Sequence, residues 1–363
     1  MWRKNLGILY VMAAAILAAF VGKGSAAGEE DFVRTRGNQF VVNGRPLYFN
    51  GFNSYWLMYM AADPTTREKV TDTFGQASEY GMNVARTWAF CDGGSNALQS
   101  SLGSYNENMF EGLDFVVSEA KKHGIYLILS LVNNWEGFGG KKQYVQWARD
   151  EGHQVNNEDE FFTNPIVKEY YKNHVKVFDW VAEMAAHVKS IDPDHLVEIG
   201  MEGFYGESTP DKKQNNPGFE VGTDFISNNL VPDIDFTTIH IYPDQWMPSS
   251  SDDEQDEFVD KWIKSHVEDS KSVLGKPLLV TEFGKSSRSS GYNVGMRDRY
   301  FGSIFNDVFG CARDEGPCGG ALFWQVMAEG MENWSDGYEV VLEQSSSTAA
   351  VVYQQSRQIS SLN

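Results

Sequence analysis

The chain has 363 residues and is strongly acidic, with 50 Asp and Glu residues, 30 Lys and Arg residues, and a formal net charge of −20. Nucleic acids and anionic membranes are bound through clustered Lys and Arg, so this balance argues against both as partners. The length fits one (β/α) barrel domain, which takes about 250 residues or more.

Residues 1–27 have the pattern of a secretory signal peptide. Arg3 and Lys4 precede an apolar run at residues 6–21, and small residues follow at 24–27. We therefore predict a secreted protein whose mature part is a single domain, residues 28–363. The alternative is a membrane anchor, but a bilayer span takes about 20 apolar residues and this run is shorter.

Short apolar segments alternate with helical patterns along the mature chain, which is typical of a parallel sheet covered by helices. A TIM-type barrel closes with eight strands. This α/β sequence has seven recognisable ones, at residues 46–51, 82–90, 125–134, 195–203, 235–244, 277–284 and 320–326. The helical patterns lie at residues 65–80, 109–123, 164–191, 255–274 and 297–311.

The missing strand falls between Val132 and Leu196. Residues 141–162 look like polar loop and short turns, and residues 164–191 carry one continuous helical pattern. A further βα unit needs about 30 residues, and they are not present. We therefore expect seven parallel strands, an unbroken helix at 164–191, and a gap or strained closure between the strands of Ile128 and Leu196.

Three cysteines are present. Cys311 and Cys318 flank a short Gly/Pro loop and could pair in an oxidising compartment, which would leave Cys91 unpaired. Spacing alone does not fix the geometry of a disulfide. Asn333 begins an N-x-S sequon, and its glycosylation is left open.

In such barrels the functional residues lie at the C-terminal ends of the strands. Glu282, in the segment VTEFG, is the candidate nucleophile, which Arg86 could hold ionised and Tyr242 could hydrogen-bond. A structural ion pair is the alternative. The strand ends predict an aromatic-rich cleft for a neutral polysaccharide, and they carry Asn53, Trp56, Arg86, Trp88, Asn133, Asn134, Trp135, Glu202, His240, Tyr242, Glu282 and Trp324.

Other catalytic motifs are weak in this sequence. The seven His residues show no metal-ligand spacing such as H-E-x-x-H. There is no G-x-S-x-G motif for a serine nucleophile. We expect no metal and no cofactor.

Ten segments carry a resemblance to a known family: GFNSYWLMYMAADPTTREKV, ARTWAFCDGG, LILSLVNNWEGFGGKKQYVQWAR, FFTNPIVKEYYKNHVKV, EMAAHVKSIDPDHLVEIGMEGFYG, GTDFISNN, IDFTTIHIYPDQW, VTEFGKS, LFWQ and DGYEVVL. Together they cover almost the whole mature chain. They resemble the plant endo-β-1,4-mannanases (mannan endo-1,4-beta-mannosidases), secreted glycoside hydrolases of family five, clan A.

The resemblance implies a secreted enzyme of the extracellular space or cell wall, and we expect it to be a monomer. It would act on mannan, glucomannan or galactomannan by a retaining mechanism. Carried over by position, Glu282 corresponds to the nucleophile. The family's substrate-binding residues correspond to Trp88, Tyr242 and Trp324, and its supporting residues to Arg86 and His240.

The sequence departs from the family at one place. The family carries a fourth strand ending in W-E-L-x-N-E-P, whose Glu is the general acid/base and whose Asn contacts the 2-hydroxyl of the sugar. Here NHVKV runs directly into FDWVAEMA, so these residues are absent and the break lies at about 177/178. Retaining hydrolysis uses two carboxylates about 5–5.5 Å apart, so we predict impaired activity. Glu202 is the nearest spare carboxylate at a strand end, whereas Asp179 and Glu183 lie on the helix.

Three alternatives stay open. One is an active enzyme whose transcript retains the missing segment. Another is a non-catalytic protein that binds mannan through the aromatic cleft. The third is a misfolded product of an exon-skipped or decayed gene.

Overall fold

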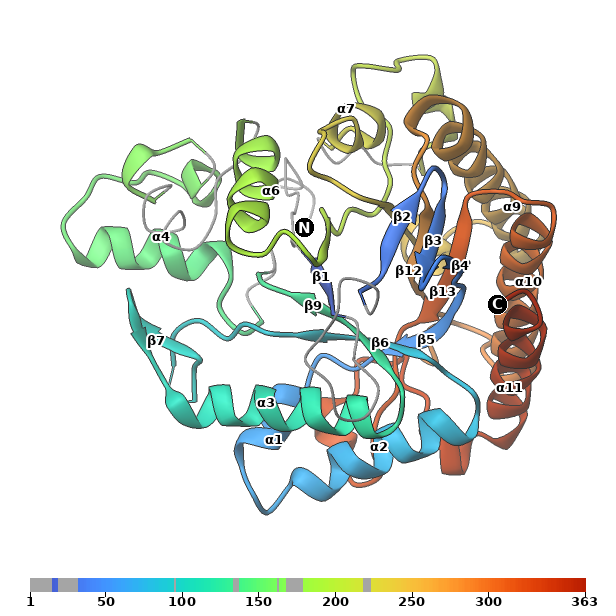
Figure 1. Ribbon diagram of the computed structural model, residues 1–363, viewed down its shortest axis with the longest axis horizontal. Helices are drawn as coiled ribbons and strands as arrows, with labels where there is room; N and C mark the ends of the chain where they lie inside the picture. The colour runs from blue at the N-terminus through green and yellow to red at the C-terminus, as the bar shows by residue number, and fades with distance from the viewer. Residues whose placement is uncertain are drawn as a thin grey trace.

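The structure is a computed structural model that describes residues 15–18, 32–94, 96–132, 137–161, 163–167, 179–217 and 223–363. Strands lie near the centre of the molecule and helices surround them (Figure 1). Within the described residues, no helix combines the length and apolarity that a bilayer crossing requires.

All seven predicted strands are present: β5 (Phe49–Asn53), β6 (Val84–Trp88), β9 (Tyr126–Ser130), β10 (Leu196–Glu198), β11 (Thr237–Ile241), β12 (Leu278–Phe283) and β13 (Cys318–Phe323). Six of them form one continuous parallel sheet in the order β9-β6-β5-β13-β12-β11. Every residue of β5, β11 and β13 is buried. Strands buried on both faces are apolar throughout, which is why these segments could be recognised in the sequence.

The place between β9 and β10 is taken by a short strand from the N-terminal segment. This strand, β1 (Ala15–Ala18), pairs antiparallel with both neighbours, so that Leu17 lies opposite Ile128 on one side and Leu196 on the other. The expected gap between these two strands is therefore bridged, which corrects that prediction. The bridging strand comes from the predicted signal peptide and not from residues 164–191.

The two ends of this eight-stranded sheet, β10 and β11, meet without a regular ladder. Two backbone hydrogen bonds join them instead: Asp235 donates to the carbonyl oxygen of Val197 at 2.9 Å, and His240 donates to that of Glu202 at 3.0 Å. The Asp235 carboxylate also accepts from the amide of Val197 at 2.7 Å. These bonds bring the end of β10 beside β11.

One end of the barrel is closed by a three-stranded antiparallel sheet, β2 (Arg34–Arg36), β3 (Gln39–Val42) and β4 (Arg45–Pro46). From it Phe40 packs against Phe49 and Phe236, with ring centroids 5.3 and 5.1 Å apart. These two rings lie where β5 and β11 begin, so the N-terminal ends of the strands are covered. This sheet does not cover the C-terminal ends of the strands, which are therefore open to form a site.

Helices follow the strands, and those described are α1 (Leu57–Ala62), α2 (Arg67–Glu79), α3 (Glu107–Lys122), α4 (Lys141–Asp150), α6 (Asp179–Ile191), α7 (Phe225–Asn229), α8 (Pro243–Trp246), α9 (Asp252–Asp269), α10 (Val294–Arg313) and α11 (Ser346–Ser360). In Figure 1, α1, α2 and α3 lie on one side of the strands and α9, α10 and α11 on another. A small hairpin, β7 (Gln99–Ser101) and β8 (Ser104–Tyr105), precedes α3.

Two expectations fall in the region after β9. Residues 141–150, expected as loop and turns, form α4, which buries Tyr144, Val145 and Ala148. The prediction of loop there is wrong because three-residue apolar spacing was hidden by polar neighbours. The predicted helix 164–191 is helical at 165–167 and in α6, and its middle, 168–178, lies outside the described residues.

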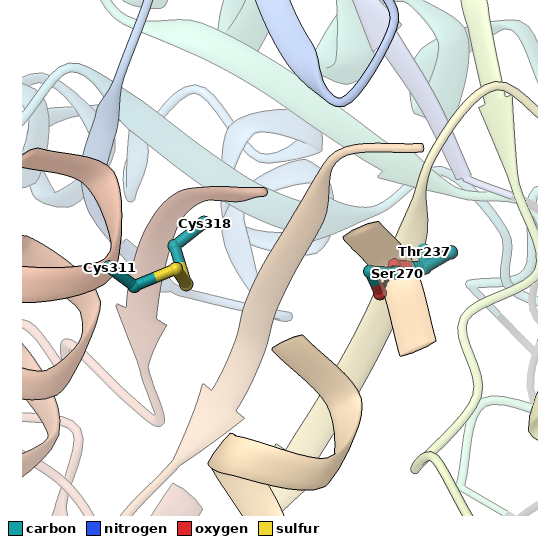
Figure 2. Close-up of a disulfide and its surroundings, with 4 residues drawn as sticks. All are labelled: Thr237, Ser270, Cys311 and Cys318. Carbon is teal, nitrogen blue, oxygen red and sulfur yellow. Dashed lines mark hydrogen bonds between the residues drawn. A yellow bond between two sulfur atoms is a disulfide. The ribbon is translucent and has the colours of Figure 1, made fainter. Parts of the chain in front are cut away.

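A disulfide joins Cys311 near the end of α10 to Cys318 at the start of β13, with the Cα atoms 5.8 Å apart (Figure 2). The possible pairing is therefore present, and Cys91 is free and buried. Figure 2 also shows the hydroxyl groups of Thr237 and Ser270, which lie 3.1 Å apart where β11 begins. Both links lie at the N-terminal ends of strands, away from the predicted site.

Candidate active site

A cavity of about 380 Å³ opens at the C-terminal ends of the parallel strands. All six predicted site residues line it: Arg86, Trp88, His240, Tyr242, Glu282 and Trp324. They come from β6, β11, β12 and the end of β13, so the fold brings together residues up to 238 positions apart (86 to 324). Further lining comes from Ser130, Val132, Gly137, Gly200, Glu202, Gln245, Trp246, Asp336 and Tyr338.

The carboxylate of Glu282, on β12, is held by two donors, one on β6 and one directly after β11. Arg86 Nη1 lies 2.5 Å from Glu282 Oε1, and Tyr242 Oη donates to Oε2 at 2.9 Å. Arg86 Nη1 is itself fixed by Asn53 Oδ1 at 3.1 Å. The Glu282 side chain is 14% exposed. It is therefore shielded from water enough for these charged hydrogen bonds to be strong, and it is still open to the cavity.

These contacts set the charge of Glu282. Burial alone would raise the pKa of the carboxyl, but His240, Arg86 and Tyr242 reverse that effect and lower the pKa below its ordinary value. Burial also lowers the pKa of His240 to about 4, so its imidazole is neutral at neutral pH. We therefore assign the ionisation of Glu282 to Arg86 and Tyr242. An ionised carboxylate is the state that a nucleophile requires.

His240 lies beside the nucleophile without bonding it directly. Its Nε2 is 3.6 Å from Glu282 Oε1, and among the described residues this buried nitrogen has no hydrogen-bond partner. A neutral imidazole in that position can donate to or accept from a sugar hydroxyl, because its hydrogen-bonding capacity is unused.

Aromatic rings form one wall of the cavity. Trp324 stacks parallel to Tyr55, with centroids 5.9 Å apart and an interplanar angle of 10°. Trp88 lies 4.9 Å from the same Tyr55 ring. The indole Nε1 of Trp324 donates to Asp336 Oδ2 at 2.6 Å, which fixes the ring orientation. Oriented aromatic faces of this kind fit the apolar C–H faces of sugar rings.

Some residues at strand ends do not line the cavity. Trp56 is fully buried and its Nε1 donates to the carbonyl oxygen of Val326 at 3.1 Å. Asn53 is also buried and donates to the carbonyl oxygen of Thr281 at 2.9 Å. Both side chains therefore support the strands. Residues 133–135, also expected in the cleft, lie outside the described residues.

Several cavity residues were missed by the sequence analysis. Tyr338 and Asp336 come from the loop after β13, and Gln245 and Trp246 come from α8. Tyr338 Oη contacts Asp244 at 3.2 Å, which holds the two loops together. All four residues lie in two segments that carry the family resemblance, IDFTTIHIYPDQW and DGYEVVL, and that resemblance is the signal that could have found them.

No group of three or more His, Cys, Asp or Glu side chains in the described part of the chain is arranged to hold a metal ion. The arrangement instead offers one ionised carboxylate, a phenol and an aromatic wall. The six residues line one cavity, and their roles in catalysis and in substrate binding are predictions.

Comparisons with known proteins point to one family. The sequence matches the model of a family described as "GH family 5 beta-mannosidase-like" over residues 30–178 and 154–337. It is 52% identical to putative mannan endo-1,4-beta-mannosidase 9 of Oryza sativa subsp. japonica, over 99% of this chain and 97% of that protein. It is also 52% identical to mannan endo-1,4-beta-mannosidase 4 of Solanum lycopersicum, over 93% of this chain and 94% of that protein.

Solved structures show the same fold. The endo-1,4-beta-D-mannanase of Thermotoga petrophila has a TM-score of 0.70 and 26% identity, over 86% of this chain and 99% of that chain. A glycoside hydrolase family 5 mannosidase of Rhizomucor miehei has a TM-score of 0.76 over 93% of this chain and 99% of that chain. At 19% identity, the second likeness shows the fold alone.

The comparisons also bear on the missing segment. The alignment with the rice protein runs over 396 residues, whereas this chain has 363, so at least 33 (396 less 363) aligned positions of the relative have no counterpart here. The two ranges that match the family overlap at 154–178, where the break was placed. With the family matched over most of its length, this chain belongs to glycoside hydrolase family 5, in the beta-mannosidase-like group.

Proposed function

We propose that this protein binds β-1,4-linked mannans in the cavity and attacks the glycosidic bond through Glu282, with slow overall hydrolysis. The observation that carries the proposal is the ionised Glu282 carboxylate, held by Arg86 and Tyr242 beside the aromatic wall of Trp324 and Trp88. The names of the rice and tomato relatives support mannan as the substrate class.

The reaction would proceed in two steps. Glu282 Oε attacks the anomeric carbon and the bond to the leaving oxygen breaks, which gives a glycosyl–enzyme ester. Water then cleaves the ester with a second inversion, so the configuration is retained. Arg86 and Tyr242 orient the attacking carboxylate, and Trp324 offers a stacking face for the sugar ring.

Slow turnover follows from the missing acid/base strand. A sugar leaving group must be protonated as the bond breaks, and the attacking water must be deprotonated. General acid–base catalysis of this kind contributes about 10²–10⁴-fold. Without the family's glutamate we expect losses in that range on natural polysaccharide, whether plain mannan, glucomannan or galactomannan.

The place of action is proposed to be the extracellular space or cell wall, where the protein would act as a monomer. The apolar segment 6–21 and the Cys311–Cys318 disulfide support secretion, because disulfides persist in oxidising compartments. Removal of residues 1–27 would also remove β1 and leave the facing edges of β9 and β10 unpaired.

A non-catalytic mannan-binding protein is the second candidate. The observation that favours it is the aromatic wall, where Trp88 and Trp324 are both in place although the acid/base segment is absent. The two candidates differ only in whether Glu282 forms a covalent intermediate.

The test is to incubate the full chain with 2,4-dinitrophenyl β-mannobioside and weigh the intact protein by mass spectrometry. Dinitrophenolate leaves without protonation, so Glu282 should become glycosylated, and peptide mapping should place the sugar on that residue. Glu282→Gln is the control and should gain no mass. A folded wild-type protein that binds mannan and gains no mass would favour the non-catalytic candidate.

A further inference from the structure

Glu202 occupies a position in the cavity that neither the family comparison nor the proposed nucleophile accounts for. It follows β10, the strand that borders the place of the missing strand, and it lines the same cavity as Glu282. Its backbone oxygen accepts from the amide of His240 at 3.0 Å, which sets it beside β11. On the opposite side of the missing strand's position, the cavity is lined by Ser130 and Val132, at and just after the end of β9.

Three carboxyl groups line the cavity among the described residues, and two of them are already engaged. Glu282 is held by Arg86 and Tyr242. Asp336 accepts from the Trp324 indole at 2.6 Å and from the Gln325 amide at 2.9 Å through the same oxygen.

The third carboxyl, Glu202, has no hydrogen-bond partner within the described part of the chain, and its side chain is mostly buried where it lines the cavity. It is therefore the carboxyl in the cavity that is free to contact a ligand.

We propose that Glu202 serves as the proton donor and acceptor for hydrolysis at Glu282, from a position one strand away from the family's acid/base. This inference rests on the proposed function, because it needs a bond that Glu282 attacks. In the first step the leaving oxygen takes the proton of Glu202 as the C–O bond breaks, and Glu202 becomes a carboxylate. In the second step that carboxylate takes a proton from water, and the water oxygen displaces Glu282 from the anomeric carbon.

The electrostatics of the cavity suit these roles. Burial, and then the negative charge of Glu282, raise the pKa of Glu202 to about 8, so it carries a proton at neutral pH. Two carboxyls whose pKa values are driven apart are the arrangement that acid and nucleophile require. Once Glu282 is esterified its charge is gone, so the pKa of Glu202 falls and its carboxylate form can accept a proton from water.

Other titratable groups face the same space. Arg86, His240, Tyr242, Asp336 and Tyr338 line the cavity with Glu202 and Glu282. Burial keeps His240 neutral and also raises the pKa of Tyr242. Neither His240 nor Tyr242 changes charge near pH 8 in the direction expected of a general acid there. Burial raises the pKa of Glu198 on β10 to about 7, but Glu198 is not among the residues that line the cavity, and Glu202→Gln leaves it in place.

The experiment compares the full chain with Glu202→Gln on two substrates. Mannopentaose has an unactivated leaving group, whereas 2,4-dinitrophenyl β-mannobioside needs no protonation. We expect the wild type to hydrolyse mannopentaose slowly, with a rate that falls as the pH rises through about 8. In E202Q the rate on mannopentaose should be at least about tenfold lower, because proton transfer contributes about 10²–10⁴-fold in well-placed cases. The decrease in rate near pH 8 should also disappear.

On the dinitrophenyl substrate, E202Q should keep the initial burst of dinitrophenolate and then stall as the ester. Azide attacks without a base, so it should restore turnover in E202Q and release a glycosyl azide of retained configuration. Glu207→Gln is the matched control, because this nearby glutamate is 86% exposed and outside the cavity. It should leave both rates unchanged.

Several results would overturn the assignment. E202Q hydrolysing mannopentaose at the wild-type rate would remove Glu202 from the mechanism and leave the proposed function standing. A wild type that shows a burst but does not hydrolyse mannopentaose would likewise remove Glu202 from the mechanism and leave the proposed function standing. A burst lost only in E202Q would show that Glu202 maintains the pocket instead of moving protons. No burst in either protein would contradict the proposed function itself.

Discussion

Tyr242 donates a hydrogen bond of 2.9 Å to one carboxylate oxygen of Glu282, while Arg86 contacts the other oxygen at 2.5 Å. Each oxygen of the candidate nucleophile thus has its own donor, Arg86 on β6 and Tyr242 directly after β11. The pair of donors counteracts burial, which would otherwise favour the protonated acid.

Removing the phenol should weaken the nucleophile. In Tyr242→Phe the ring remains and the hydrogen bond is lost, so the pKa of Glu282 should rise. Glycosylation by dinitrophenyl β-mannobioside should slow by about tenfold, because a hydrogen bond to a charged group is worth about 1.4 kcal/mol. Stopped-flow release of dinitrophenolate measures this step. Tyr353→Phe, at an exposed position on α11, is the control and should behave as the wild type.

The pH dependence of glycosylation should reveal Arg86. Because this guanidinium lowers the pKa of Glu282, the wild-type rate should stay level as the pH falls and decline only below the ordinary range of a glutamate. In Arg86→Gln the decline should begin at a higher pH. Unchanged profiles in a folded variant would show that Arg86 does not control the charge of Glu282.

Stability should depend on pH in a direction set by buried acids. Burial raises the pKa of Asp92 to about 7, although Tyr144 and the backbone of Gly140 hydrogen-bond it. A carboxyl whose pKa is higher in the folded state stabilises the fold fully below its unfolded pKa, and this contribution disappears as the pH rises through about 7. Urea unfolding should therefore give a lower free energy of unfolding at pH 8 than at pH 5.

The variant Asp92→Asn should reduce that difference, because the amide does not ionise. Burial raises the pKa values of Glu198 and Glu202 to about 7 and about 8, so these two residues should account for the rest of the difference in stability between pH 5 and pH 8. His240 and His266, whose pKa values burial lowers to about 4, act in the opposite direction, so the test is the comparison between the two proteins. The same pH dependence in Asp92→Asn and in the wild type would contradict this account.

The disulfide should contribute measurable stability. Cys311 and Cys318 are seven residues apart, and closing so short a loop is worth about 2 kcal/mol in the chain-entropy model. Replacing both residues with Ala should lower the free energy of unfolding by that order. Dithiothreitol should lower the stability of the wild type and leave the double variant unchanged. Equal stability of the two proteins without reductant would show that the bond does not support the fold.

The N-terminal strand makes a prediction that bears on secretion. A protein lacking residues 1–27 has no β1, so the edges of β9 and β10 lose their partner. We expect a lower melting temperature and more aggregation than for the full chain, since unpaired edges invite pairing between molecules. Identical melting and solubility would show that β1 adds nothing to the barrel.

The sequence predicted the parts of the structure that depend on local pattern. The strand positions and the place of Glu282 follow from apolar runs and from the rule that sites lie at strand ends, and β6 and β12 fall within the predicted ranges. The pairing of Leu17 with Ile128 and Leu196 could not be foreseen, because partners more than 100 residues apart leave no trace in local periodicity.

Loop contributions to the cavity were also beyond the sequence. Tyr55 stacks on Trp324 and Asp336 accepts a hydrogen bond from its indole. The spacing of the residues around Tyr55 and Asp336 does not predict where these loops fold back onto the cavity. Trp56 illustrates the reverse error, since its position at a strand end suggested the cleft and its indole is buried in the core. Position along a strand fixes the face of a side chain only while the strand continues.

The central claim is that Glu282 is a working nucleophile in a chain without the family's acid/base. It is tested most directly by measuring kcat/KM for β-mannan and for 2,4-dinitrophenyl β-mannobioside, with this protein and the tomato relative side by side. We predict that the rate on mannan is lower here by about 10²–10⁴-fold, whereas the rate of the first dinitrophenolate release agrees within about tenfold. Equal rates on mannan, or equal losses on both substrates, would contradict the claim.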